Sequence, residues 1–253
     1  MNMHIFYKFL LTIIVLNNSL NQVPERKIKA AIFDLDGTLL DTQRLYDEIN
    51  QLVINEYGNG KPYDIDLQIK IHGSPPLFGN KYLIDYFDIK LTMKEFMAKK
   101  EQYLKDKIAE CKPIEGVKEL THLLKHKYGL KTAIATSSLK SSTDNKLKNH
   151  QEWIKSDFDV IISGEDKRIV KGKPSPDIFL IAAKELGVKP EECIIFEDAI
   201  NGAQAGLNSG AAIVVGLPDS YVKDIMQNLP HDESRTKLCI LNSFKNFDYS
   251  LIK

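Results

Sequence analysis

Two aspartates stand two positions apart in the segment AIFDLDGTLLDT, which spans residues 31–42. Asp34 and Asp36 come at the end of an apolar run, and a glycine and a threonine follow them at once. Neighbouring carboxylates repel each other, and burying either one is costly unless it is paired or bound to a cation. The pattern therefore predicts a site at which positive charge is held against these two side chains.

The apolar run before these aspartates, residues 29–35, predicts a short buried strand that ends in a turn. Similar runs rich in Ile and Val recur at residues 131–135, 160–163, 193–196 and 211–215. Stretches with helical spacing alternate with them, at residues 117–127, 143–154, 176–186 and 201–209. Strands that alternate with helices are typical of a parallel sheet buried on both faces. The predicted fold class is therefore α/β, with a Rossmann-like, doubly wound parallel sheet.

Residues 64–111 have a different pattern: their apolar residues are spaced as in helices, and no strand pattern interrupts them. The stretch before them, residues 41–57, also places apolar residues on one helical face. Thr92 is the predicted N-cap of a helix over residues 93–109, since its hydroxyl can accept from free backbone N–H groups and Glu95 follows in the first turn. Together these stretches predict an all-helical domain inserted into the α/β core.

In open α/β sheets, ligands bind outside the carboxyl ends of the strands, so the residues that follow each strand are the candidates for chemistry. Four segments supply polar side chains there: Asp34 and Asp36; Thr136, Ser137 and Ser138; Lys173; and Glu197 and Asp198. Clustered carboxylates suit Mg²⁺, and a carboxylate can attack phosphorus to give an aspartyl-phosphate. A lysine with hydroxyl and amide donors can hold phosphoryl oxygens, while a second carboxylate moves protons. This set predicts phosphoryl transfer.

The segment FDLDGTLLDT resembles the first signature of the haloacid dehalogenase superfamily, in which DxDGT follows an apolar strand. Three further segments resemble the later signatures in the same order: IATSS around Thr136, KGKPSPDIF around Lys173, and IIFEDAINGAQAGLNSG with Glu197 and Asp198. The resemblance covers residues 30–218. It implies the same α/β fold with a helical cap between the first two signatures, and an enzyme that is a phosphoric monoester hydrolase.

The resemblance also implies a role for each of these residues. Asp34 is expected to be the nucleophile that becomes phosphorylated, and Asp36 the general acid and base. Thr136 is expected to hold the phosphoryl oxygens, and Lys173 to neutralise charge between Asp34 and the phosphate. The expected substrate-binding residues are Thr136, Ser137, Ser138 and Lys173. The expected Mg²⁺ ligands are Asp34, the main-chain carbonyl of Asp36, Asp198 and, alongside it, Glu197.

Residues 163–187 and 192–219 resemble a eukaryotic subgroup that includes pseudouridine-5'-phosphatase and sugar- and glycerol-phosphate phosphatases. The implied function is Mg²⁺-dependent hydrolysis of a small phosphomonoester, with pseudouridine 5'-phosphate as one candidate and sugar or glycerol phosphates as alternatives. A β-phosphoglucomutase is a further alternative, but that branch carries a histidine twelve residues after the nucleophile, where this chain has Tyr46. A non-catalytic phosphate-binding module is an alternative from another class, and the presence of every signature residue argues against it.

The predicted domain division follows these elements. Residues 1–26 are a predicted leader or extension, residues 27–44 and 114–253 the predicted core, and residues 45–113 the predicted helical cap. A cap of this kind is expected to close over the site and to select the substrate.

Gly58–Pro62 and Lys112–Gly116 are the predicted hinges of the cap, because glycine and proline punctuate both segments. His72, Ser74 and Asn80 lie where the resemblance implies a loop that determines substrate specificity.

The charges of the 253-residue chain balance, with 34 Lys and Arg against 34 Asp and Glu. This balance gives no electrostatic reason to expect nucleic acid or an anionic membrane as a partner, so a small phosphorylated metabolite is the expected partner. The apolar stretch 9–16 is much shorter than the roughly 20 residues that span a bilayer, although it has the length of a signal-peptide core. We therefore expect no membrane span, a monomer, and a cytoplasmic location, with secretion if residues 1–22 act as a signal peptide. The three widely spaced cysteines predict free thiols.

Overall fold

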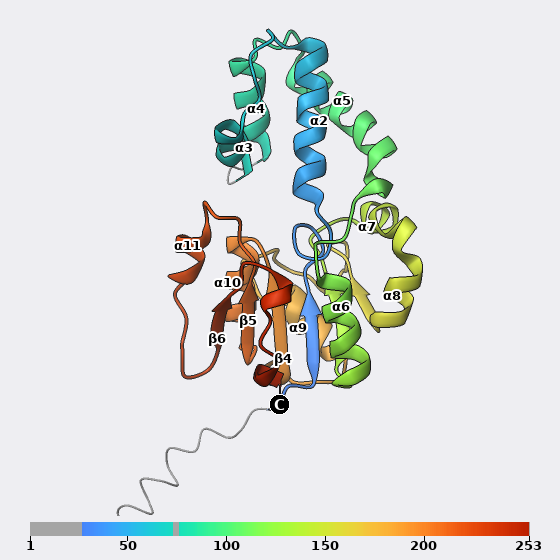
Figure 1. Ribbon diagram of the computed structural model, residues 1–253, viewed down its shortest axis with the longest axis vertical. Coiled ribbons are helices and arrows are strands. Elements are labelled where there is room, and N and C mark those ends of the chain that lie inside the picture. Colours follow the sequence, from blue (N-terminus) through green and yellow to red (C-terminus); the bar gives the residue numbers. More distant parts are fainter. Residues whose placement is uncertain (1–26, 73–75, 253) are drawn as a thin grey trace, which may run out of the picture.

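The computed structural model describes residues 27–72 and 76–252. The predicted leader at residues 1–26, and Ser74 of the predicted specificity loop, lie outside the described residues. The described residues form an α/β core and, beyond the carboxyl end of its sheet, a helical cap (Figure 1). The predicted fold class, a parallel-sheet core with an inserted all-helical cap, is confirmed.

The sheet places the predicted site residues along one edge. In the part of the chain that the structure describes, six parallel strands follow the order β3-β2-β1-β4-β5-β6. Their bounds are Ala30–Phe33 (β1), Lys131–Ala135 (β2), Val160–Ile162 (β3), Cys193–Glu197 (β4), Ile213–Gly216 (β5) and Lys237–Ile240 (β6). Because β1 pairs with β2 on one side and β4 on the other, the residues that follow these three strands lie next to one another.

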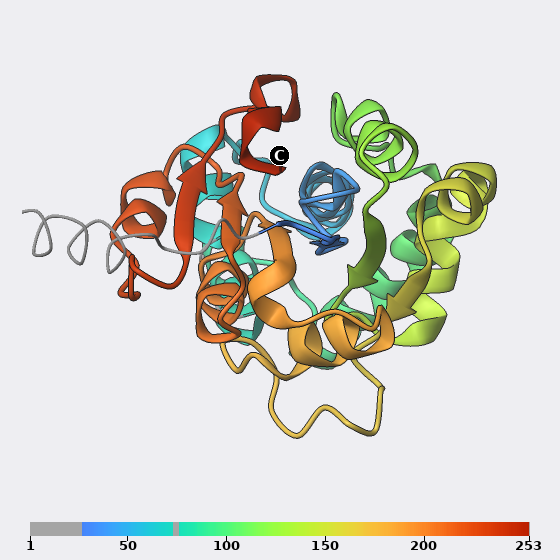
Figure 2. The same ribbon diagram turned by 90° about the horizontal axis from the view of Figure 1, so that it is seen from below.

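Helices cover both faces of the sheet, and the alternation of side chains along β1 accounts for this, since successive residues of a strand point to opposite faces. Phe33 belongs to the apolar cluster on one face and Ile32 to the cluster on the other. The first face is covered by α6 (Val117–His122), α7 (Lys140–Leu147) and α8 (Gln151–Asp157), and the second by α9 (Asp177–Glu185), α10 (Ile200–Asn208) and α11 (Lys223–Gln227). Figure 2 shows green α6 and orange α10 on opposite sides of the sheet.

The single helix predicted over residues 143–154 is wrong, because the structure has two helices there. A 3-10 turn over Lys148–His150 separates α7 from α8. In this turn the ring Nε2 of His150 lies 2.7 Å from the carbonyl oxygen of Cys111. The contact ties the turn to the segment that leads from the cap back into the core, and the spacing of apolar residues does not reveal such a long-range bond.

The cap has an apolar core of its own, built from residues such as Val53 and Phe87. Its helices are α2 (Thr42–Tyr57), α3 (Ile65–His72), α4 (Pro76–Tyr86) and α5 (Met93–Lys107). The predicted N-cap of the last helix is confirmed. Thr92 Oγ1 accepts from the backbone N–H of Glu95 at 3.3 Å, and Glu95 Oε2 accepts from the backbone N–H of Thr92 at 2.8 Å.

The chain passes between core and cap twice, and the two passages lie side by side. The backbone N–H of Asp41 donates to the carbonyl of Lys112 at 2.8 Å, and that of Ile114 donates to the carbonyl of Leu39 at 3.0 Å. The predicted hinge at Gly58–Pro62 is wrong, because this segment follows α2 at the end of the cap that is remote from the core (Figure 1). The other predicted hinge begins at the junction itself, and its movement stays a prediction, as do the exact domain bounds.

Cys111, Cys193 and Cys239 are free thiols, as predicted. The helices that the structure describes include none with both the length and the apolar character required to cross a membrane.

The ring of Phe196 stacks on that of Phe33 at the centre of the sheet, with centroids 4.4 Å apart, and Phe196 is fully buried. We expect Phe196→Ala to lower the free energy of unfolding by about 3–5 kcal/mol, because the lost side chain leaves a cavity. The control is Leu180→Ala on α9, where 39% of the residue is exposed, and its effect should stay below about 1 kcal/mol. Urea denaturation measures both values, and equal effects would contradict the central role of Phe196.

Candidate active site

The turn after β1 brings Asp34 and Gly37 against the end of β4. The backbone N–H of Asp34 donates to the carbonyl of Phe196 at 3.0 Å, and only 6% of Asp34 is exposed. Gly37 has a φ of 82°, and a Cβ at this position would lie 2.1 Å from the Asp198 Oδ2 atom. Glycine is therefore required at position 37 for two reasons: the backbone is left-handed there, and the carboxylate of Asp198 leaves no room for a side chain.

Lys173 joins the ends of three strands. Its Nζ atom lies 2.5 Å from Asp34 Oδ1 after β1, 2.6 Å from Glu197 Oε1 on β4, and 3.4 Å from the carbonyl of Ala135 on β2. Only 10% of the lysine side chain is exposed. Burial opposes the charge of this ammonium group, but Asp34 and Glu197 outweigh that effect and raise the pKa of Lys173 above its usual value.

The carboxylates at this edge of the sheet form a cluster. One oxygen from each of Asp34, Glu197 and Asp198 lies within 4.8 Å of the other two. Burial raises the pKa of Asp34 to about 7, although Lys173 acts in the opposite direction. Burial and the charges of Glu197 and Asp34 also raise the pKa of Asp198 well above its usual value. One lysine cannot balance three ionised carboxylates, so an added cation would favour their ionised forms and would be bound favourably.

Hydrogen bonds hold the two carboxylates after β4 in place. Thr38 Oγ1, which is fully buried, donates to Asp198 Oδ1 at 2.9 Å. Glu197 Oε2 accepts from the backbone N–H groups of Asp198 and Ala199, both at 3.1 Å. Both oxygens of Glu197 are thus engaged, one by backbone amides and one by Lys173.

The residues after β2 form a hydroxyl-lined turn beside this cluster. Thr136 is buried, and its Oγ1 atom accepts from the backbone N–H of Ser138 at 3.0 Å. Ser137 is exposed at the tip of the turn. The Oγ atom of Ser138 donates to Asp36 Oδ2 at 2.7 Å, so this hydroxyl points to the second aspartate.

Asp36 has a partner that the sequence analysis missed. Lys146 on α7 places its Nζ atom 2.5 Å from Asp36 Oδ1 and 2.8 Å from Ser138 Oγ, and only 1% of its side chain is exposed. A lysine within a polar helical stretch resembles any solvated lysine in sequence, and no motif marks it. The structure therefore places the ends of β1, β2 and β4 and Lys173 together, and it adds Lys146 and Thr38 to the predicted residues. Asn80 of the predicted specificity loop instead accepts from Lys100 Nζ at 2.9 Å within the cap.

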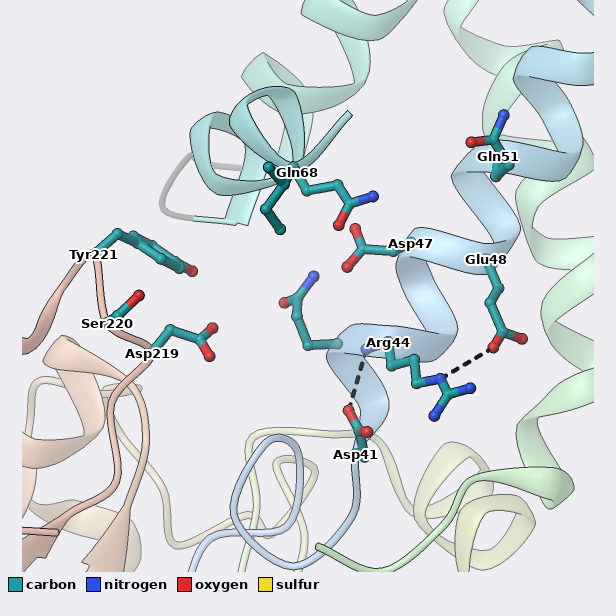
Figure 3. Close-up of a pocket in the computed structure, with 11 residues that line it drawn as sticks. Asp41, Arg44, Asp47, Glu48, Gln51, Gln68, Asp219, Ser220 and Tyr221 are labelled. Atoms are coloured by element: carbon teal, nitrogen blue, oxygen red, sulfur yellow. Dashed lines mark hydrogen bonds and ion pairs between the residues drawn. The ribbon is translucent and has the colours of Figure 1, made fainter. Parts of the chain in front are cut away.

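A cavity of about 580 Å³ opens between cap and core. Figure 3 shows Gln68 and Asp47 of the cap on one side, and Asp219, Ser220 and Tyr221 of the core on the other. Burial and then Asp219 raise the pKa of Tyr221, with smaller contributions from the charges of Asp198 and Asp47.

Residues 31–215 match the haloacid dehalogenase-like hydrolase family. The chain belongs to this family. Among curated proteins it is 31% identical over 196 residues to a probable pseudouridine-5'-phosphatase of Drosophila melanogaster, an alignment that covers 77% of this chain and 83% of the relative. It is 33% identical over 194 residues to the phosphorylated carbohydrates phosphatase of Thermotoga maritima, covering 76% and 87%.

A crystal structure of a hydrolase of the same family from Deinococcus radiodurans, with bound phosphate and sodium, has a TM-score of 0.68. It is 24% identical and the match covers 86% of this chain and 93% of that one, so this likeness concerns the fold. The predicted resemblance to the family is confirmed, and so is the predicted enzyme class, a phosphoric monoester hydrolase.

The carboxylate of Glu197 leaves no room for a side chain at Gly202 on α10, because a Cβ there would lie 1.8 Å from Glu197 Oε1. We expect Gly202→Ala to displace this carboxylate from Lys173, to lower the free energy of unfolding by about 1–3 kcal/mol, and to reduce activity. Gly172→Ala is the control, since a Cβ at Gly172 meets no atom within 4 Å. Thermal unfolding and phosphate release would be measured on both variants, and a Gly202→Ala protein that behaves like the control would contradict this packing.

Proposed function

We propose that the chain is a Mg²⁺-dependent phosphatase that hydrolyses a small phosphomonoester through an aspartyl-phosphate on Asp34. The observation that carries this proposal is the buried contact of Asp34 with Lys173, inside a carboxylate cluster at the carboxyl edge of the sheet. The family and the named phosphatases among its relatives support the same reaction class.

In the first step, a carboxylate oxygen of Asp34 forms a bond to phosphorus, and the bond from phosphorus to the leaving oxygen breaks. Lys173 lies 2.5 Å from Asp34 Oδ1, so its ammonium group stands where charge gathers on the transferring phosphoryl group. Thr136 and the amide of Ser137 at the adjacent strand end are the proposed donors to the phosphoryl oxygens.

Asp36 is the proposed proton carrier. It gives a proton to the leaving oxygen as the first bond breaks, and it takes a proton from the water that then attacks the aspartyl-phosphate. The water oxygen becomes part of inorganic phosphate, and the carboxylate of Asp34 is regenerated. Asp36 suits this role because 28% of its side chain is exposed, whereas Asp34 is buried.

The donor set fits a hard divalent cation. Carboxylate and carbonyl oxygens are the ligands that Mg²⁺ prefers, and the cluster offers three carboxylates against one lysine. Asp34, Asp198 and the main-chain carbonyl of Asp36 are the proposed ligands, and Glu197 stays a predicted ligand although both its oxygens already accept hydrogen bonds. When bound, Mg²⁺ would neutralise charge on the phosphoryl group.

The cavity in Figure 3 supports a phosphate ester of a neutral, hydroxyl-rich molecule. Amides and hydroxyls line it, from Gln43, Gln51, Gln68, Ser220 and Tyr221. Its charged residues are Asp41, Asp47, Glu48 and Asp219 against Arg44, and this negative balance would repel a second anionic group. Pseudouridine 5'-phosphate and sugar or glycerol phosphates fit this description, whereas sugar bisphosphates do not.

The mutase alternative receives no support from Tyr46. Burial raises the pKa of this phenol to about 12, with a further contribution from Asp36, so it stays protonated near neutral pH. It therefore cannot exchange protons as the histidine implied for mutases would.

Phosphate release from p-nitrophenyl phosphate tests the activity. We expect it to require Mg²⁺, and Asp34→Asn to reduce it by at least about 10³-fold, because an amide cannot form the aspartyl-phosphate. Asp144→Asn, at an exposed position of α7, should leave activity unchanged. A structure with beryllium fluoride should show the fluoride group on Asp34, and turnover by folded Asp34→Asn protein would remove this residue as nucleophile.

Fructose 6-phosphate and fructose 1,6-bisphosphate form a matched pair that tests the charge of the cavity. We expect kcat/KM to favour the monophosphate by about tenfold or more, since the second phosphate meets the acidic lining. Asp219→Asn should reduce this preference several-fold, whereas Asp224→Asn, at an exposed position of α11, should not. An unchanged preference in Asp219→Asn would show that this carboxylate does not select against anions.

A further inference from the structure

Lys146 is a buried lysine. Its residue is 1% exposed, and it reaches from α7 to the carboxyl edge of the sheet. Removing an ammonium group from water is unfavourable unless opposite charge and hydrogen bonds compensate for it. Asp36 Oδ1 at 2.5 Å and Ser138 Oγ at 2.8 Å provide that compensation. A residue that is costly to bury and yet placed beside a proposed proton carrier calls for a functional explanation.

The three side chains form a closed ring of hydrogen bonds. Lys146 donates to Asp36 Oδ1 and to Ser138 Oγ, and Ser138 in turn donates to Asp36 Oδ2 at 2.7 Å. Because the hydroxyl accepts from the ammonium group, its own hydrogen is directed to the carboxylate. Each oxygen of Asp36 is held by a donor from a different segment, so the rotation of the carboxylate is restricted about both side-chain torsions.

We propose that Lys146 is the positioning residue of Asp36: with Ser138, it aims the carboxyl group at the leaving oxygen of the substrate. This inference rests on the proposed function, in which Asp36 protonates that oxygen. Only 1% of the Lys146 side chain is exposed, against 28% of Asp36, so Lys146 acts through Asp36, whereas Lys173 acts on Asp34 and the phosphoryl group. The two buried lysines therefore serve the two aspartates separately.

The consequence depends on the leaving group. Proton transfer from a well-placed acid contributes about 10²–10⁴-fold to a rate, and only where the departing oxygen needs the proton. An alkoxide, as in glycerol 3-phosphate, needs it, whereas p-nitrophenolate departs readily without it. If the Asp36 carboxyl group is no longer correctly oriented, hydrolysis of glycerol 3-phosphate should therefore slow far more than hydrolysis of p-nitrophenyl phosphate. A general disturbance of the site would slow both alike.

The experiment compares kcat/KM of Lys146→Met for glycerol 3-phosphate and p-nitrophenyl phosphate, because kcat/KM includes the step in which the leaving group departs. We expect a loss of about 10²-fold for the alkyl ester and less than about fivefold for the aryl ester. Lys146→Arg, which keeps a charged donor, should recover part of the loss. Lys140→Met, on the exposed side of the same helix, should behave as wild type.

Two further measurements separate positioning from structure. Asp36→Asn should show the same dependence on leaving group, and adding Lys146→Met to it should cause no further loss, since both changes remove one function. A crystal structure of Lys146→Met should show the carboxylate of Asp36 displaced while Asp34 and Lys173 keep their contact. If that variant fails to fold, Ser138→Ala removes the second donor and should give a smaller loss with the same selectivity.

Equal losses for the two esters, additive losses in the double variant, or an unmoved Asp36 would overturn the role of Lys146. Wild-type protein that releases phosphate from neither ester would instead contradict the proposed function, and the position of Asp36 in the crystal structure would still test the positioning itself.

Discussion

The structure of the site depends on one electrostatic constraint, the burial of several carboxylates at the edge of a parallel sheet. Strand order places the ends of β1 and β4 side by side, which brings Asp34 against Glu197 and Asp198. Lys173 is the cation that makes this arrangement tolerable, and it contacts the ends of β1, β2 and β4 at once. One ammonium group cannot balance three ionised carboxylates, so the same constraint that shapes the fold would also favour the binding of a cation at this edge.

The two aspartates after β1 avoid mutual repulsion by taking different partners. Asp34 turns to Lys173 in the buried cluster, whereas Asp36 turns to Lys146 and Ser138 on the other side of the turn. Their different exposures follow from this division. A buried, lysine-bound carboxylate is suited to attack a phosphoryl group that replaces water, and a partly exposed one is suited to exchange protons.

The sequence predicts the strands and the residues that follow them because short apolar runs and local turn chemistry are properties of neighbouring residues. Asp34, Thr136, Lys173 and Asp198 were found in this way. Lys146 could not be, since its burial results from the packing of α7 against a distant strand end. The break after α7 also depends on a long-range contact, that of His150 with Cys111. The hinge at Gly58–Pro62 was misplaced because glycine and proline mark a turn, whereas only tertiary contacts decide which turn joins two domains.

Charge is distributed unevenly across the site, and this asymmetry bears on how a substrate would lie. The phosphoryl group is attracted to Lys173 at the sheet edge, where an added Mg²⁺ would strengthen the attraction. The cavity between core and cap has the opposite character, since carboxylates such as Asp47 and Asp219 outnumber the guanidinium of Arg44 among its lining residues. A monoester with a neutral leaving group would suit both regions only if its phosphoryl group lay at the sheet edge and its leaving group lay in the cavity. Under the proposed function, a molecule with two phosphates would satisfy one region at the expense of the other, so the charges of the site would favour monoesters.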